Sequence, residues 1–231
     1  MNDLQFEKLY KEKGLASQRR YPNEALIQFL AANYFNLSPK ERKKIKILEL
    51  GCGSGANLWM MAKEGFDVYG IDIAPSGVKL CKKMLKNWKV SAKVILGNMR
   101  KLVFPNNFFN SVVDVVSVQH VDLKGHKKIY QEAYRCLKPG GKLFQWHLGE
   151  KSVSFALGKG KKIDKFTIDG IRNPKVPFYG CGLICFLAPT EAKKMLKEAG
   201  FKNINIEIYK RTYKNRKQKI EYLAISAEKS K

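Results

Sequence analysis

The sequence has no run of apolar residues near the roughly 20 that a membrane-spanning helix requires. Its first segment, residues 1–13, carries too many charges for the apolar centre of a secretory signal peptide. Cysteine is also scarce: the five residues are an odd number and form neither zinc-ribbon pairs nor a disulfide framework. From these absences we expect a cytoplasmic protein with no membrane span, whose reduced cysteines mostly fill the core. We also expect no metal site, because the Cys181 and Cys185 spacing lacks histidine or further cysteine partners.

Acidic residues are the other scarcity. The chain has 20 Asp and Glu against 44 Lys and Arg, which gives a formal net charge of +24. Such an excess raises a nucleic acid or an anionic membrane surface as a partner. Arginine, the preferred residue for phosphate and base-edge contacts, supplies only eight of the 44, and the lysines are dispersed. Two interpretations stay open: a compositional bias of the source genome, which we slightly favour, and a surface that binds RNA.

The chain does contain enough apolar material for a well-buried core, with 231 residues of which 45% are hydrophobic. This composition excludes disorder. Short apolar runs alternate with longer amphipathic ones, a pattern typical of βαβ units around a parallel sheet. Strands are predicted at 45–50, 68–73, 92–96, 111–118, 142–147, 201–209 and 220–227. Helices are predicted at 4–13, 23–34, 57–64, 77–88, 123–137 and 190–199, the last with Thr190 as its N-cap.

The periodicity also suggests how the chain is divided. Residues 1–44 are expected to form a helical cap, followed by one domain over 45–231. Within that domain, residues 148–188 show no clean period. A stretch of this length inside a compact domain is typical of a lid or substrate-binding insertion. The last two predicted strands are joined by a short basic link, so we expect them to form an antiparallel hairpin.

A glycine-rich turn over residues 51–55 separates the first predicted strand from a helix. Such a turn lets backbone approach a ligand closely, and nucleotide-type cofactors are its usual occupants. Gly51, Gly53 and Ala56 satisfy the dinucleotide-binding pattern as well. Glu49 argues against a dinucleotide, because a carboxylate in an apolar strand is costly to bury unless it serves a cationic or hydrogen-bond-donating ligand. The Glu49 carboxylate would repel the pyrophosphate of a dinucleotide.

Residues 47–55, Ile-Leu-Glu-Leu-Gly-Cys-Gly-Ser-Gly, resemble the first motif of class I S-adenosylmethionine-dependent methyltransferases. Segments 69–73, 97–99 and 137–143 resemble later motifs of the family, in the right order. The resemblance covers about residues 45–148, and the terminal helix and hairpin agree with the family's reversed last strand. It implies an α/β fold of three layers, doubly wound, with a mostly parallel seven-stranded sheet and an antiparallel last strand.

The same resemblance implies an enzyme with S-adenosyl-L-methionine as cofactor and S-adenosyl-L-homocysteine as product. Asp72 is similar to the acid that holds the ribose hydroxyls, and Ile73 to the residue that packs on adenine. Asn98 stands where the family usually has Asp, so we expect retuned adenine recognition, with a plain turn residue as the alternative. The expected cofactor-binding residues are Glu49, Gly51, Cys52, Gly53, Gly55, Asn57, Asp72, Ile73, Asn98, Met99, Ser117 and Arg20.

Residues just after the fourth and fifth predicted strands are candidates for acceptor chemistry, because ligands of such sheets lie at the carboxyl ends of the strands. His120 is the expected catalytic residue, as a general base or substrate contact, and fixing the loop is an equal alternative. His147 is a weaker candidate for the substrate site, with a purely structural role favoured. His126 lies on a polar helix face and is expected at the surface.

Two further segments supply candidates for the substrate site. The N-terminal segment is expected to fold over the cofactor, as such segments often do in this family, and to bring Tyr10, Arg20 and Tyr21 to it. Arg20 would pair with a carboxylate of cofactor or substrate, and a solvated charge beside Arg19 is the alternative. Tyr179 of the insertion is expected to line the acceptor pocket, with lid packing as the alternative.

The favoured function is in-line transfer of a methyl group to an oxygen or nitrogen nucleophile of a small molecule. The main alternative is an RNA methyltransferase that uses the basic link 210–217, where aromatic residues interleave with cations. Against it, residues 117–120 lack the Asn/Asp-Pro-Pro-aromatic motif of base-amino methylation. A cofactor-binding protein without catalysis and a nicotinamide oxidoreductase are the remaining alternatives. The sequence makes no prediction of the oligomeric state.

Overall fold

A seven-stranded sheet forms the centre of the structure, a computed structural model that describes residues 3–230. Its strands lie in the order β3-β2-β1-β4-β5-β10-β9. The first five are parallel, and β10 is antiparallel to both of its neighbours. This confirms the predicted α/β class, with its antiparallel last strand and terminal hairpin. The bounds are β1 (Lys46–Leu50), β2 (Asp67–Asp72), β3 (Lys93–Leu96), β4 (Phe109–Val115), β5 (Leu137–Leu148), β9 (Phe201–Tyr213) and β10 (Gln218–Lys229).

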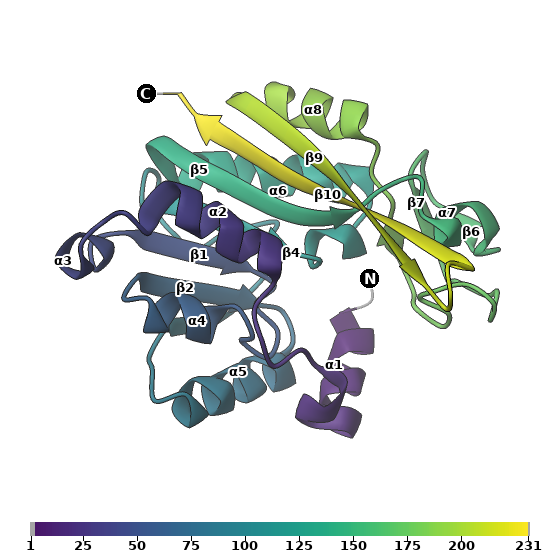
Figure 1. Ribbon diagram of the computed structural model, residues 1–231, viewed down its shortest axis with the longest axis horizontal. Coiled ribbons are helices and arrows are strands. Elements are labelled where there is room, and N and C mark those ends of the chain that lie inside the picture. Colours follow the sequence, from purple (N-terminus) through teal and green to yellow (C-terminus); the bar gives the residue numbers. More distant parts are fainter. Residues whose placement is uncertain (1–2, 231) are drawn as a thin grey trace.

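Helices cover both faces of this sheet and complete the three layers (Figure 1). On one face lie α2 (Glu24–Tyr34), α4 (Leu58–Lys63) and α5 (Pro75–Asn87). On the other lie α6 (Leu123–Cys136) and α8 (Pro189–Glu198). The remaining helical segments are α1 (Asp3–Lys13), η1 (Gly14–Ser17), α3 (Pro39–Arg42), η2 (Val118–His120) and α7 (Val153–Leu157), of which η1 and η2 are 3₁₀ turns.

The two faces of β1 show why the sheet is buried on both sides. Successive strand residues point to opposite faces, so Ile47 joins the cluster under α2 and α4 while Leu48 joins the cluster under α6. Both side chains are fully buried. Burial of one such side chain contributes about 1.5–3 kcal/mol. The run of apolar residues in this strand therefore serves two separate cores.

Several element boundaries differ from those predicted, among them the starts of the last helix and of β5. The last helix begins at Pro189 with Ala188 as its N-cap, not at Thr190, because proline at the first helical position presets the helical φ and has no N–H to satisfy. Strand β5 begins at Leu137, five residues early, because Leu137 already pairs with Phe109. The pairing then shifts between this pair and Ser111 with Lys142, so the predicted Pro-Gly-Gly turn is an irregularity within the strand.

Residues 148–188 contain a small sheet of their own. It consists of β6 (Lys161–Lys162), β7 (Thr167–Asp169) and β8 (Ile184–Cys185), paired antiparallel. Its apolar face packs with Leu148 and Ile220 of the main sheet in a third cluster. Figure 1 shows this unit beyond the carboxyl end of β5, and α1 beside the carboxyl ends of β1 and β2. The division into a cap, a domain and an inserted lid stays a prediction.

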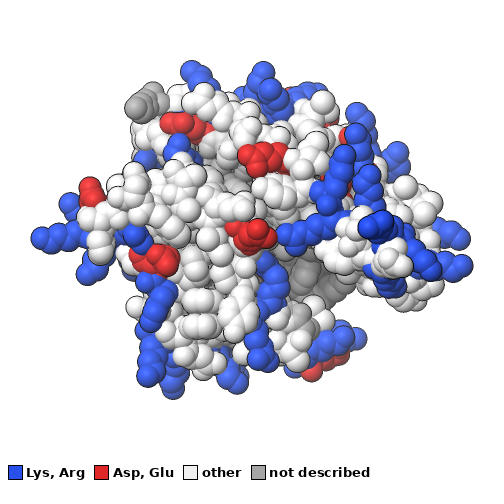
Figure 2. Space-filling model, in the orientation of Figure 1, with Lys and Arg blue, Asp and Glu red and all other residues white. Residues whose placement is uncertain are grey.

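The surface reflects the positive net charge. Figure 2 shows Lys and Arg spread over one face with few acidic residues between them, and gathered around the turn between β9 and β10. Residues 211–217 at this turn are all exposed. None of the helices within residues 3–230 is long and apolar enough to span a membrane.

Candidate active site

A cavity of about 270 Å³ opens at the carboxyl ends of β1, β2 and β4. Its walls are the glycine turn after β1, the end of β2, the loop after β3 and the segment from β4 into η2. Helix α1 supplies Phe6 and Tyr10 as a cover, and Leu183 reaches it from the insertion. This is the edge of a doubly wound sheet at which ligands bind.

Two glycines of the turn lie so close to neighbouring residues that there is no room for a side chain at either position. Gly51 has a φ of +60°, and a Cβ there would lie 2.4 Å from the Cβ of Ser117. The Ser117 hydroxyl donates to the Gly51 carbonyl at 2.8 Å and ties the turn to the loop after β4. Gly53 has a φ of +49°, and a Cβ there would lie 2.8 Å from the Tyr10 hydroxyl oxygen. Both positions require glycine because of conformation and space together.

Glu49 is a buried carboxyl group with an unused oxygen. It is 2% exposed, and its Oε1 accepts a hydrogen bond from Asn57 Nδ2 at 2.5 Å. The Asn57 side chain is held in turn by the backbone N–H of Asn23, which donates to its Oδ1 at 3.0 Å. The other carboxyl oxygen, Oε2, is buried and has no hydrogen-bond partner within residues 3–230. Burial raises the pKa of Glu49 to about 8.

Asp72 links the end of β2 to the glycine turn. Its Oδ2 accepts the backbone N–H of Gly53 at 2.7 Å, and its Oδ1 accepts that of Ala74 at 2.9 Å. Burial raises the pKa of this carboxyl group against the lowering effect of these hydrogen bonds. Each oxygen retains a further lone pair for a ligand.

Asp114 forms the support behind the cavity wall. Its Oδ1 accepts the backbone N–H groups of Ser117 and Val118 at 2.9 and 3.0 Å, and its Oδ2 accepts from Gln145 at 3.2 Å. These bonds end β4 at Val115, three residues before the predicted end, since the chain turns there into η2. Val116 takes a φ of +61° at this turn, a strained conformation for a β-branched residue beside the cavity.

The charges around the cavity favour a positively charged ligand. Burial raises the pKa of Asp114 to about 7, and the Arg19 guanidinium opposes this rise for both Asp114 and Glu49. Arg19 lines the cavity, but its side chain forms no ion pair with either of these two acids, both within residues 3–230. A cation near Glu49 would remove the cost of ionising a buried carboxyl group, so the cavity suits a ligand with positive charge.

Helix α1 closes the cavity from outside the sheet. The Glu7 carboxylate accepts from the Ser76 backbone N–H at 2.9 Å and from its hydroxyl at 2.7 Å, which fastens α1 to the first turn of α5. Phe6 packs edge-on against the His120 ring, with centroids 4.7 Å apart. The cover therefore depends on contacts between segments about 70 to 114 residues apart, which no local pattern encodes.

His120 lies in η2 at the cavity wall. Its Nδ1 is 3.1 Å from the carbonyl oxygen of Leu183, and since a carbonyl only accepts, Nδ1 carries the proton. Nε2 is then the accepting nitrogen of the neutral ring, 3.4 Å from the amide nitrogen of Gln119. Burial lowers the pKa of His120 to about 4, so the neutral form is present at pH 7. The ring has the protonation state that a general base requires.

The structure brings most of the predicted site residues to this one cavity. Its lining residues include Glu49, Gly51, Cys52, Gly53, Asn57, Asp72, Ile73, Asn98, Met99, Ser117, His120 and Tyr10. Asn98 also accepts the Arg100 backbone N–H through Oδ1 at 2.9 Å, so it fills the turn role that was the alternative to adenine binding. The two roles are compatible, because an amide oxygen has two lone pairs.

Two predicted cofactor residues do not line the cavity. At Gly55 a Cβ would lie 2.7 Å from the Cys81 sulfur, so this glycine allows α5 to pack closely. Arg20 is exposed, and the cavity takes Arg19 instead. The Arg20 backbone carbonyl accepts the Trp59 indole N–H at 2.9 Å, a contact that fixes this part of the segment between η1 and α2.

Three of the predicted substrate residues also lie elsewhere. Tyr21 is 66% exposed and packs edge-on against Trp59 and Trp88. Tyr179 is 61% exposed at the surface of the insertion. His147 is fully buried and does not line the cavity.

His126, expected at the surface, is in fact fully buried. Its ring turns inward from α6 and stands beside the ring of His147, with the two Nε2 atoms 3.0 Å apart. His126 lies three, four and seven residues before Ile129, Tyr130 and Ala133, which belong to the buried face of α6, so the helical period places it inward and the expectation of a surface position is wrong.

Among the cavity residues that were not predicted are Phe6, Gln18, Arg19 and Leu183. Three belong to the N-terminal segment, which was expected to fold over the site, and the aromatic Phe6 beside Tyr10 was the available signal. Leu183 comes from the insertion, where the absence of a period gave no basis for choosing one residue over another.

Comparison with known proteins adds independent evidence. Residues 47–141 match the model of a family described as a methyltransferase domain. A sterol 4-C-methyltransferase of Caenorhabditis elegans is 23% identical over 176 residues, which cover 75% of this chain and 49% of that protein. A thiol S-methyltransferase of Rattus norvegicus is 37% identical over 122 residues, covering 49% of this chain and 47% of that protein. The chain thus spans about half the length of the curated relatives it matches.

Solved structures show the same fold. A SAM-dependent methyltransferase of Methanosarcina mazei superposes with a TM-score of 0.68 at 20% identity, over 84% of this chain and 99% of that one. Phosphoethanolamine N-methyltransferase 2 of Haemonchus contortus, solved with S-adenosyl-L-methionine, has a TM-score of 0.66 at 15% identity, over 98% of this chain and 60% of that one. The match over residues 47–141 and the topology of the sheet identify in this chain a methyltransferase domain with the class I, Rossmann-like fold.

Proposed function

We propose that the protein transfers the methyl group of S-adenosyl-L-methionine to an oxygen or nitrogen nucleophile of a small molecule. The observation that carries this proposal is the position of His120, a neutral ring that lines the same cavity as Glu49 and Asp72. The site therefore combines acids suited to a cationic cofactor with a group able to accept a proton from an acceptor molecule. The cover by α1 would reduce the access of water to such a site.

The cofactor would be held by the residues that line the cavity. Asp72 would accept the two ribose hydroxyls, Ile73 would pack on adenine and Asn98 would accept from the adenine amino group. Glu49 would lie near the positively charged part of the cofactor, since its Oε2 has no partner within the described chain. The glycine turn, together with Cys52, Asn57, Met99 and Ser117, would contact the remaining part of the cofactor.

The cofactor supplies a methyl group on a sulfonium, which is an excellent leaving group. The chain then has to place the acceptor in line with that methyl group at about 3 Å, and positioning of this kind accounts for much of the rate. A hydroxyl or amine acceptor must also lose a proton, which His120 Nε2 would take. Its Nδ1–H bond to Leu183 keeps the ring in the accepting orientation. Tyr10, the remaining substrate candidate, would contribute its hydroxyl from the cover.

The small-molecule class is supported by the relatives, whose names specify sterol, thiol and phosphoethanolamine methylation. It is also supported by the shape of the cavity, which α1 covers on one side and which Leu183 of the insertion reaches. We assign residues 1–44 to a cap and 148–188 to a lid that shapes the acceptor site, within a domain over 45–231. A cytoplasmic location agrees with the five cysteines, which are all free thiols.

RNA is the second candidate acceptor, because the turn between β9 and β10 presents a cluster of exposed basic residues (Figure 2). Lys210, Arg211, Lys214, Arg216 and Lys217 belong to it, with Tyr213 41% exposed among them. Cations interleaved with an aromatic side chain are suited to a single strand. An RNA methyltransferase would show binding whose logarithm falls linearly with the logarithm of salt concentration.

Calorimetric titration of the purified protein tests the proposal first. The ligands are S-adenosyl-L-methionine, S-adenosyl-L-homocysteine and a reduced nicotinamide dinucleotide, at moderate salt. We expect micromolar binding of the first two only. Incubation with labelled cofactor and a small-molecule extract should then give a methylated product. Cofactor binding with no product from any extract or RNA would point to a binding protein without catalysis, and binding of the dinucleotide alone would refute the cofactor assignment.

A further inference from the structure

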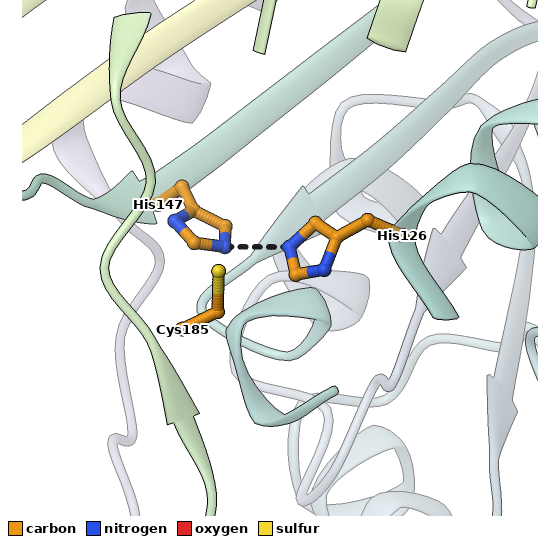
Figure 3. A group of neighbouring side chains, drawn as sticks. All are labelled: His126, His147 and Cys185. Atoms are coloured by element: carbon orange, nitrogen blue, oxygen red, sulfur yellow. Dashed lines mark hydrogen bonds between the residues drawn. The ribbon is translucent and has the colours of Figure 1, made fainter. Parts of the chain in front are cut away.

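A second cluster of chemically active side chains lies away from the cofactor cavity. His126 comes from α6, His147 from the end of β5 and Cys185 from β8 of the insertion. All three are fully buried, and their ligand atoms lie within 4.8 Å of one another. Figure 3 shows the two imidazole rings meeting edge to edge with the sulfur directed at the space beside them. None of the three lines the cofactor cavity.

The hydrogen bonds of the two rings leave an unusual arrangement of protons. His126 Nδ1 is 2.9 Å from the carbonyl oxygen of Asp122, and His147 Nδ1 is 2.8 Å from that of Leu148. Carbonyl oxygens only accept, so both Nδ1 atoms carry protons. In neutral rings both Nε2 atoms then present lone pairs, and these face each other at 3.0 Å. Two lone pairs at this distance repel unless a positive centre lies between or beside them.

A proton is one such centre, and a metal ion is the other. A shared proton would leave a positive charge fully buried. Asp122 and Asp164 act on His126 only through space, and no carboxylate within the described chain is hydrogen-bonded to either ring. A buried charge without a partner is costly. A metal ion avoids this cost, because the Cys185 thiol can bind it as a thiolate and bring a negative charge to the cluster.

We propose that His126, His147 and Cys185 bind a zinc ion through the two Nε2 atoms and the sulfur. Imidazole and thiolate are the ligands that zinc prefers, and the Nδ1–H bonds to backbone carbonyls are the outer contacts that orient ligating histidines. In binding, the Cys185 S–H bond breaks, an S–Zn bond forms, and the proton passes to solvent. Three protein ligands leave the fourth position to a water molecule.

The distances between the three ligand atoms need only small changes to fit a tetrahedral zinc ion. On a tetrahedral zinc ion two imidazole nitrogens stand about 3.3 Å apart, and a nitrogen and a thiolate about 3.6 Å, for ordinary zinc bond lengths. The two nitrogens here are 3.0 Å apart, so they separate slightly. The sulfur, within 4.8 Å of both, moves inward by at most about 1.2 Å.

Thr167 gives a second, independent indication. It pairs directly with Cys185 between β7 and β8, so the two side chains lie on the same face of that sheet. The Thr167 hydroxyl is fully buried, faces the Cys185 sulfur, and finds no oxygen or nitrogen partner in the part of the chain that the structure covers. A thiolate on zinc would accept this hydroxyl proton, and second contacts of this kind are typical of metal sites.

The position of the cluster indicates what the ion does. Two ligands belong to the main domain and the third to the inserted sheet, so the ion would fasten the insertion to α6 and β5. Since the site is separate from the cofactor cavity, this inference does not depend on the proposed methyl transfer. No histidine lies near Cys185 in the sequence, but the folded chain brings His126 and His147 beside it. The expectation that Cys185 lacks histidine partners is therefore wrong.

The test begins with the full chain, purified without chelators from zinc-supplemented medium. We expect about one equivalent of zinc by mass spectrometry. After removal of the metal, Co²⁺ should give the thiolate-to-metal charge-transfer band and the d–d bands of a tetrahedral site. Zinc binding should release one proton per ion, measured by calorimetry in buffers of different ionisation enthalpy. Absence of both bound zinc and the cobalt bands would overturn the proposal.

Two cysteine variants provide a matched pair. Cys185→Ser removes the proposed ligand and should lower zinc affinity by at least about 100-fold. Cys181→Ser changes the other cysteine of the insertion, four residues away and only partly buried, and should keep the zinc. A chelator should lower the Tm of the wild type and of C181S but not of C185S. Retention of zinc by C185S would refute the site, and if C185S does not fold, the wild-type cobalt spectrum decides.

Discussion

Asp72 accepts the backbone N–H of Gly53 through Oδ2 at 2.7 Å, so the acid at the end of β2 holds the glycine turn that follows β1. Two sequence motifs 19 residues apart are thereby a single unit of structure. The bond leaves the carboxylate with lone pairs directed at the cavity and fixes it before any ligand arrives. A site arranged in advance loses less conformational entropy on binding.

Asp72→Ala should abolish high-affinity cofactor binding. The change removes charge-assisted hydrogen bonds to the ligand, each contributing about 1.5–3 kcal/mol, and so lowers affinity by at least about 100-fold. It also leaves the N–H groups of Gly53 and Ala74 without their acceptor. Calorimetric titration with S-adenosyl-L-homocysteine measures the effect. Asp67→Ala, at the other end of β2 where the carboxylate is partly exposed and pairs with Lys93, is the control and should bind normally. Near-native affinity in D72A would contradict the site assignment.

Gly53→Val should also abolish cofactor binding, because the side chain enters space shared by backbone, Tyr10 and ligand. Part of the effect of such a change is backbone strain at positive φ. Gly65→Ala isolates that part, since Gly65 has a φ of +90° and open space around its Cβ position. G65A should lower stability by about 1 kcal/mol and bind the cofactor normally. Equal binding by both variants, measured by the same titration, would show that Gly53 does not face the ligand.

His120 variants should separate catalysis from positioning. Both His120→Ala and His120→Asn should keep cofactor affinity and slow turnover of a hydroxyl or amine acceptor by about 10²–10⁴-fold, the usual contribution of a general base. The asparagine side chain can still donate to the Leu183 carbonyl, so it preserves the loop contact that Nδ1 makes. Recovery of wild-type kcat in H120N, with loss only in H120A, would reduce His120 to a positioning residue.

The pH profile of the same reaction gives a second measurement. Since burial holds the pKa of His120 near 4, the ring is neutral and able to accept a proton at every pH above that value. The wild-type kcat should therefore fall as the pH drops through about 4 and show no histidine-dependent limb near pH 6.5. A limb at the ordinary histidine pKa that disappears in H120N would contradict the buried environment of the ring.

The sequence predicts those parts of the site whose signals are local. Strand, glycine turn and acid follow one another closely along the chain, and Glu49, Gly51 and Asp72 line one cavity, while their roles toward a cofactor stay a prediction. Predictions for segments without a period were poorer: Arg19 lines the cavity, whereas the predicted Arg20 does not. The cluster of His126, His147 and Cys185 was invisible, because its members come from three elements that only the folded chain brings together.

Glu49→Gln should change how stability depends on pH. Burial raises the pKa of this group to about 8 in the folded chain, from an ordinary value of 4.5. Between these values the folded state binds a proton that the unfolded state has lost, so the free energy of unfolding falls as pH rises through this window. The slope amounts to at most about 1.4 kcal/mol per pH unit for one proton. Glutamine remains neutral and should remove this contribution.

Urea unfolding of the cofactor-free protein at pH 5, 6, 7 and 8 measures that slope. Asp114, whose pKa burial raises to about 7, adds a similar contribution with the same sign, so the wild-type slope should exceed that of E49Q without vanishing in the variant. Glu64→Gln, which changes a carboxylate in a partly exposed pair with Arg42, is the control and should leave the slope unaltered. Equal slopes in the wild type and E49Q would mean that Glu49 is ionised in the free protein. The cofactor would then meet an existing charge, and its binding would release no proton from this residue.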